Sequence, residues 1–143
     1  MQTLYLFFKL PAAWFMGIRP VEVTETQCRV ALPYRWRSQN PFRSIYFAAQ
    51  CAAGEMASGL MALQDLRKRP PCSMLVLRVE AEFYKKADQK MVFTCTEGAL
   101  IRQTIDQTFE TRTAQTVRAL SVGTLPDGTE AAKVWVTWSF KAK

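Results

Sequence analysis

Histidine is absent from this chain of 143 residues. Its absence excludes Ser-His-Asp and Cys-His nucleophile systems, histidine-ligated zinc sites and any histidine general base. The sequence also has neither a GxGxxG nor a GxxxxGK[ST] phosphate-binding loop. We therefore expect no bound metal and no cofactor, and any acid–base chemistry has to use a carboxylate.

Cysteine is scarce, with four residues and no C-x-x-C pair among them. Each cysteine lies in an apolar or strand-like context, which is typical of free buried thiols in a reducing compartment. The chain is expected to be cytoplasmic on this ground. The apolar run at residues 1–18 is short and broken by Lys9 and Pro11, so it predicts a helix packed on the sheet rather than a signal peptide or a membrane span. A role at a membrane surface is the alternative for this segment.

The net charge is +7, and a basic balance of this size suits an anionic partner. Nucleic acid is a poor candidate because the aromatic residues follow core periodicity and form no exposed platform among the basic side chains. The basic clusters can also be ordinary solvated faces. Coenzyme A phosphates or an acidic carrier protein fit the charge better.

A long apolar segment dominates the middle of the chain. Asn40-Pro41 is a turn signal, Ser44 can cap a helix start, and no proline follows until Pro70. Because residues 45–63 are almost all apolar or small, the sequence predicts a buried central helix from Ser44 to about Lys68.

Short strand patterns surround this helix. We expect one strand at 21–32, an alternating strand at 75–84, a third at 91–95, and two long strands at 111–124 and 133–141, with a short helix or irregular segment at 98–107. The alternation predicts that Leu75, Leu77, Val79, Val134, Val136 and Trp138 are largely buried. Residues 1–143 thus form a single α+β domain, an antiparallel sheet around one helix.

Glu55 is the single acid in the apolar part of the central helix. Its helical neighbours are small, so another surface can approach the carboxylate closely. Burial on such a helix would raise its pKa, which suits a general base. Equally, Glu55 could extend to solvent or pair with an arginine.

The order of elements and the Asn40–Glu55 segment resemble the hotdog fold, and specifically the DUF4442-like proteins related to phenylacetate-pathway-type acyl-CoA thioesterases. The resemblance implies that Glu55 is the catalytic acid, that Asn40 precedes the helix as a catalytic asparagine, and that Ser73 supplies a hydroxyl. The usual His-Gly pair at the helix start is replaced by Tyr46 and Phe47. The Phe47 N–H would be the oxyanion donor and Tyr46 a substrate contact.

Structural explanations compete with each of these assignments. Asn40 before a proline is a common turn residue, Ser73 can be a plain strand hydroxyl, and Tyr46 and Phe47 can be core or tunnel-wall aromatics. Lys85 and Lys86 follow a strand end and are our candidates for contacting coenzyme A phosphates.

Helix geometry adds a condition to any catalytic role of Glu55. At 1.5 Å per residue, Glu55 lies about 16 Å from a helix start at Ser44. Only a second chain can bring its helix start to Glu55, so we expect at least a homodimer, and a tetramer is compatible. Two hypotheses follow: an acyl-CoA or acyl-carrier thioesterase, or a non-catalytic hotdog module that binds an acyl or other apolar ligand.

Overall fold

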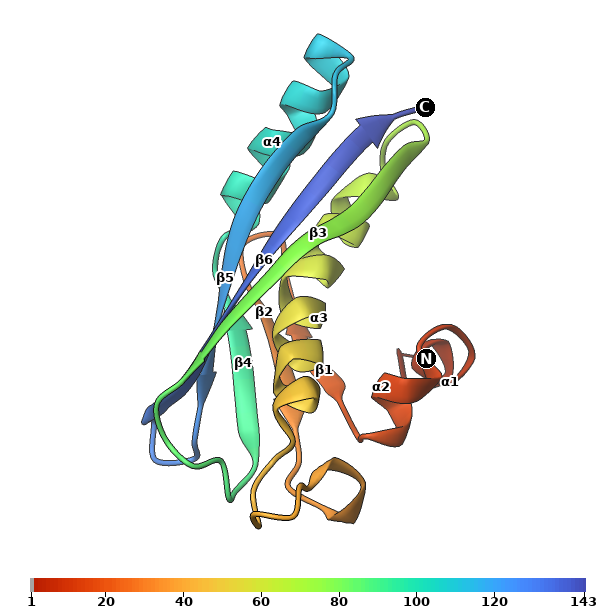
Figure 1. Cartoon of the computed structure of the whole chain (residues 1–143). Coiled ribbons are helices and arrows are strands. Elements are labelled where there is room, and N and C mark those ends of the chain that lie inside the picture. Colours follow the sequence, from red (N-terminus) through yellow and green to blue (C-terminus); the bar gives the residue numbers. More distant parts are fainter. Residues whose placement is uncertain (1) are drawn as a thin grey trace.

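The computed structural model describes residues 2–143. Its six strands form one antiparallel sheet in the order β1-β2-β4-β5-β6-β3. The sheet curves around a single long helix, α3 (Phe47–Leu66), with α4 (Gly98–Thr111) near one end (Figure 1). This is the hotdog fold that the sequence resemblance implies. Met1 lies outside the described residues.

The core lies between α3 and the sheet. The long strands β5 (Gln115–Thr124) and β6 (Glu130–Ala142) pair along most of their length. Val134, Val136 and Trp138 are buried as predicted. The helix approaches closely because Gly54 has no Cβ, and an added Cβ would lie 2.6 Å from Val134. The buried Trp138 indole N–H donates to Ser58 Oγ at 2.8 Å, so α3 and β6 are also joined by a buried hydrogen bond.

The central helix is shorter than predicted. It begins at Phe47 and not near Ser44, because the side chain of Ser44 hydrogen-bonds Asn40 instead of capping a helix. The helix ends close to the predicted position of about Lys68, because Leu66 is its last residue and Arg67 is the C-cap. The preceding loop includes a 3-10 turn, Trp36–Ser38.

The predicted strand at 21–32 is a hairpin of two strands, β1 (Arg19–Val23) and β2 (Cys28–Leu32). Thr24 Oγ1 accepts the backbone N–H groups of Thr26 (3.3 Å) and Gln27 (3.0 Å), and this local hydrogen bonding turns the chain. Alternation alone did not reveal the turn, because threonine and glutamine also fit a strand.

The predicted burial of Leu75, Leu77 and Val79 is wrong: their exposed fractions are 61%, 55% and 45%. A bulge between Val76 and Arg78 in β3 (Cys72–Phe83) shifts the side-chain alternation. Leu75 faces away from the core, which receives Met74 and Val76 instead. Val79 is opposite the buried Val136, and its exposure reflects the position of β3 at the open edge of the sheet.

The remaining strands agree with expectation apart from their ends. β4 (Met91–Cys95) buries Met91, Phe93 and Cys95. The segment predicted at 98–107 is α4, which continues to Thr111, so β5 begins at Gln115 rather than at 111. All four cysteines are free, and Cys28 and Cys95 are buried.

The N-terminal segment forms two short helices, α1 (Gln2–Lys9) and α2 (Pro11–Phe15), where one was predicted. Pro11 stands at the start of α2, where its missing N–H costs no helical hydrogen bond. Figure 1 shows both helices at the side of the domain, next to the end of β1, and α2 contacts α3. Leu6 and Ala13 are buried, whereas Leu4, Phe7, Phe8 and Phe15 are exposed.

Candidate functional site

A hollow of about 390 Å³ lies at the start of α3, where the loop before the helix meets the end of β3. We call it the helix-start hollow. It gathers five of the site residues predicted from the sequence, which come from two segments about forty positions apart. Its lining consists of Asn40, Phe42, Ser44, Ile45, Tyr46, Phe47, Gln50, Phe83, Tyr84, Lys85, Lys86 and Ala87.

Asn40 organises the loop that forms one wall of the hollow. Its Oδ1 accepts the backbone N–H groups of Phe42 (2.9 Å) and Ser44 (3.2 Å). Its Nδ2 donates to Ser44 Oγ at 2.9 Å and to the Ile45 carbonyl at 3.4 Å. The amide is therefore engaged with its own loop, including the bend where Arg43 has a φ of 59°. Asn40 acts on the hollow by shaping the loop.

The first turn of α3 presents unused backbone N–H groups to the hollow. The N-cap residue is Tyr46, and no side chain in the described residues caps the helix. The Ile45 N–H donates to the Ala87 carbonyl and the Tyr46 N–H to the Ser38 carbonyl, each at 2.8 Å. The Phe47 N–H has no such partner within residues 2–143. Together with the positive end of the helix dipole, this N–H is suited to an anionic oxygen.

Two aromatic rings stand at the rim of this turn. The rings of Tyr46 and Phe47 meet edge to face with centroids 5.0 Å apart, and they are 46% and 56% exposed. They are therefore wall residues of the hollow rather than core residues. The Phe47 N–H is available because Phe47 is the first helical residue, whose N–H has no intrahelical acceptor, and because no side chain in the described residues caps it.

Sequence reasoning missed Gln50, Phe83 and Tyr84, which also line the hollow. Gln50 is buried, and its Nε2 donates to the Ile45 carbonyl at 3.3 Å. Gln50 follows Phe47 by three positions, so both side chains lie on one side of the helix. This spacing is the sequence signal that could have identified Gln50. Phe83 and Tyr84 could have been found from their position just before Lys85 at the strand end.

Glu55 lies outside the hollow, eight residues after Phe47, or about 12 Å further along the helix axis. It is half-buried, and desolvation by burial raises the pKa of its carboxyl above the ordinary value of 4.5. Within the described part of the chain the carboxylate has neither a hydrogen-bond donor nor a cationic partner within 4.0 Å. It lies against Gly59, close to the ring of Trp138.

Ser73 is not brought together with the other predicted residues. It is exposed near the start of β3, and its neighbours Cys72 and Met74 pack against the core. Because successive side chains of a strand alternate between faces, Ser73 points to the face of the sheet away from α3. The structure does place Lys85 and Lys86 at the hollow, just after the end of β3.

A family model for a domain of unknown function, DUF4442, matches residues 2–139. The chain belongs to the DUF4442 family. None of the curated proteins matches its sequence. The match covers all the elements described above except the last residues of β6, so this DUF4442 domain comprises both the helix-start hollow and Glu55.

Solved structures share the fold of this DUF4442 domain at low sequence identity. A protein of unknown function from Chlorobaculum tepidum has a TM-score of 0.81 and 14% identity, covering 99% of this chain and 93% of its own. A Pseudomonas aeruginosa protein described as a probable thioesterase has a TM-score of 0.80, 15% identity and coverages of 99% and 94%. A Haemophilus influenzae thioesterase has a TM-score of 0.73, 16% identity and coverages of 97% and 88%.

Among the helices of residues 2–143, none combines the length and apolar character needed to cross a bilayer. No group of three or more cysteine, aspartate or glutamate side chains in this range is placed to hold a metal ion.

Proposed function

We propose that this DUF4442 domain hydrolyses acyl thioesters, with acyl-CoA as the preferred class, at a site shared by two chains. The helix-start hollow of one chain would hold the thioester, and Glu55 of the other would act as the base or nucleophile. One observation above all supports the proposal: Asn40, Tyr46, Phe47, Lys85 and Lys86 surround an uncapped helix start.

The Phe47 N–H is suited to the thioester carbonyl. A tetrahedral intermediate of acyl transfer carries a negative oxygen, which backbone N–H groups at a helix start stabilise. Asn40 is a positioning residue in this scheme, since its bonds to Phe42, Ser44 and Ile45 fix the loop that leads into the helix.

Glu55 supplies the acid–base chemistry. Its carboxylate would take a proton from water, whose oxygen then bonds to the carbonyl carbon and forms the oxyanion. When the oxyanion collapses, the carbon–sulfur bond breaks, and the thiolate leaves and takes up the proton from Glu55. A direct attack by the carboxylate is the alternative within the same geometry. The raised pKa of Glu55 suits proton transfer near neutral pH.

The 12 Å between Glu55 and its own helix start requires a second chain. The edge strand β3 leaves unpaired backbone groups and exposes Leu75, Leu77 and Val79. Two copies related by a two-fold axis could pair their β3 edges. The small, half-buried residues one turn before Glu55, Cys51 and Ala52, would then let an antiparallel partner helix approach.

An assay of acyl-CoAs from short to long chains tests this function, with hydrolysis measured as release of the free thiol. We expect release of free coenzyme A that depends on enzyme concentration. If the protein binds members of the series but hydrolyses none, it is a binding module. One observation favours that second function: Phe47, in place of the glycine of related thioesterases, puts an aromatic ring beside the proposed oxyanion donor.

Replacing both Lys85 and Lys86 by Gln is expected to raise KM for acyl-CoA roughly five- to thirtyfold and to leave kcat unchanged. Two exposed charge contacts of up to about 1 kcal/mol each give this range. The matched substrate is the same acyl group on pantetheine, which lacks the nucleotide phosphates and should show no change in KM. An equal change for both thioesters would contradict phosphate binding by these lysines.

A further inference from the structure

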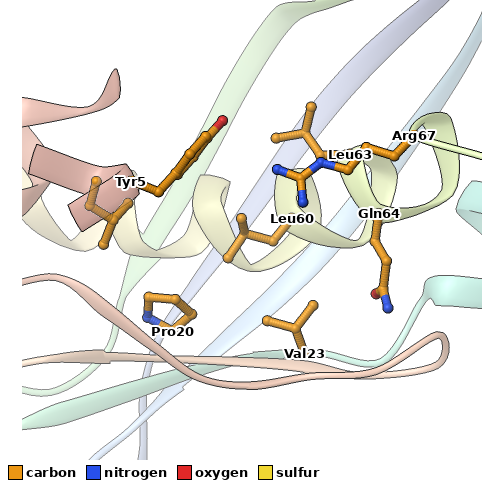
Figure 2. A pocket seen from close by; sticks show the side chains of 8 residues that line it. Tyr5, Pro20, Val23, Leu60, Leu63, Gln64 and Arg67 are labelled. Carbon is orange, nitrogen blue, oxygen red and sulfur yellow. The ribbon is translucent and has the colours of Figure 1, made fainter. Parts of the chain in front are cut away.

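A second cavity, of about 440 Å³, lies between α1, β1 and the C-terminal half of α3 (Figure 2). We call it the α1–α3 cavity. Its volume is in the range of small-molecule sites in proteins. None of its residues lines the helix-start hollow. Its lining consists of Tyr5, Leu6, Pro20, Val23, Leu60, Leu63, Gln64 and Arg67.

The cavity occupies a different face of α3 from Glu55. Three residues of α3 and its C-cap, Arg67, line it at positions i, i+3, i+4 and i+7, beginning at Leu60, so they form one stripe along the helix. Glu55 precedes Leu60 by five residues, which corresponds to about 140° around a helix of 3.6 residues per turn. A ligand in the α1–α3 cavity would therefore not occupy the space next to Glu55.

The body of the cavity is apolar. Figure 2 shows Leu60 projecting from α3 toward Pro20 and Val23 of β1, with Tyr5 of α1 at one end. No aspartate or glutamate is among the residues that line it. These walls suit a hydrocarbon chain, because the chain would bury apolar surface on both sides.

Arg67, the cation at the mouth of the cavity, is not neutralised by an acid of residues 2–143. Lys68 pairs with Glu25 at 3.2 Å, and Arg69 pairs with Asp65 at 2.8 Å. Arg67, beside them in sequence, has no carboxylate within 4.0 Å among the described residues. Its guanidinium instead lies 5.8 Å from the centroid of the Tyr5 ring. A ligand carboxylate could pair with it in the bidentate geometry that arginine favours.

Gln64 adds a second polar group. Its Oε1 is buried and has no hydrogen-bond partner within residues 2–143. Figure 2 shows its amide reaching from α3 toward β1. Buried polar atoms are nearly always hydrogen-bonded, and a water bound with a ligand's head group would supply the missing donor.

We propose that the α1–α3 cavity binds the carboxylate form of a medium-chain fatty acid. The chain would lie between α3 and β1, and the carboxylate would pair with Arg67. The site does not depend on the proposed hydrolysis, because it uses neither Glu55 nor the helix-start hollow. If both proposals hold, the ligand belongs to the class of acid that hydrolysis of an acyl-CoA releases.

Calorimetric titration with sodium decanoate below its critical micelle concentration tests this site. We expect one decanoate per chain for the wild type. The variant Arg67→Gln should raise the dissociation constant about tenfold or more, as for the loss of one charge-assisted contact. Decanol should bind the wild type about as weakly as decanoate binds Arg67→Gln. Leu60→Trp should weaken decanoate binding, because the larger side chain narrows the space between α3 and β1.

Matched variants show whether the effect is local. Lys68→Gln removes the same charge one residue away, and Lys85→Gln with Lys86→Gln removes charge from the helix-start hollow; both should leave the dissociation constant unchanged. Loss of binding in the Lys85 and Lys86 variant would place the acid in the hollow and overturn the proposal. So would an unchanged constant in Arg67→Gln, a variant at an exposed position, or no binding up to millimolar decanoate. None of these binding results decides the proposed hydrolysis of acyl-CoA, which thiol release from the wild type measures separately.

Discussion

Replacing Glu55 by Gln is expected to lower kcat for acyl-CoA hydrolysis by about a hundredfold or more. Loss of a general base typically costs 10²- to 10⁴-fold in rate, and a base that acts only in the transition state leaves KM nearly unchanged. Glutamine keeps the size and hydrogen-bonding capacity of glutamate but cannot take a proton from water. Steady-state thiol release from the two proteins measures the effect.

The matched control is Glu110→Gln, which removes an exposed carboxylate from the C-terminal part of α4. It should hydrolyse acyl-CoA at the wild-type rate. If Glu55→Gln also retains the wild-type kcat, Glu55 is structural and the proposed mechanism is wrong.

Glu55→Gln should also be more stable toward unfolding than the wild type at pH 7. Burial raises the pKa of Glu55 in the folded chain, so the folded state holds this proton more tightly than the unfolded state does. Between the unfolded pKa of about 4.5 and the higher folded value, stability falls as the pH rises, and the deficit persists above that window. Glutamine has no such deficit. Urea unfolding at pH 7 and at pH 4 should show an advantage for Glu55→Gln that disappears at the lower pH.

Raising the pH should increase the rate of hydrolysis, although it lowers the stability of the fold. A base must be ionised to act, so kcat/KM of the wild type should rise with pH through the pKa of Glu55, with a midpoint above 4.5. Glu55 thus combines a cost in stability with a gain in activity, a combination that is common at functional sites.

Introducing lysine at both Leu75 and Leu77 is expected to convert the protein to a monomer and to reduce hydrolysis at least a hundredfold. Lysine on an edge strand opposes pairing with another edge, because like charges meet across the two-fold axis. Both leucines are exposed in the chain, so the fold itself should tolerate the change. Activity should fall because a monomer cannot bring Glu55 to a helix start.

Sedimentation at micromolar concentration measures the assembly, and far-UV circular dichroism confirms that the variant is folded. Leu100→Lys is the matched control, since Leu100 is an exposed leucine on α4 rather than on β3. It should remain a dimer with full activity. A folded Leu75 and Leu77 variant that is monomeric yet fully active would disprove the shared site, and a wild type that sediments as a 16 kDa monomer would disprove the dimer.

Much of the fold could be predicted because its signals are local. The apolar composition of residues 45–63 marked α3, and alternation in the last strand identified Val134, Val136 and Trp138 as core residues. The errors occurred where a single residue alters a pattern. The bulge at residues 76–78 of β3 exchanged the buried face, and the Thr24 hydroxyl turned one predicted strand into a hairpin.

The candidate site was only partly predictable. Sequence reasoning named Asn40, Tyr46, Phe47, Lys85 and Lys86 separately, and the fold joined them in one hollow. It missed Gln50, and it included Ser73, whose side chain points away from the helix. The side to which a strand residue points depends on register and bulges, which pairing with neighbouring strands determines.

By itself the sequence determined that any acid–base chemistry must use a carboxylate, since there is no histidine, and that one long apolar helix must be buried. Composition and periodicity are sufficient for such conclusions, because each depends on residue types along a single segment. Only the tertiary structure decided that α3 begins at Phe47 with a free N–H, that β3 is an open edge, and that Arg67 stands beside an apolar cavity. These features arise from contacts between segments far apart in the chain, where loop hydrogen bonds, strand order and packing override local preference.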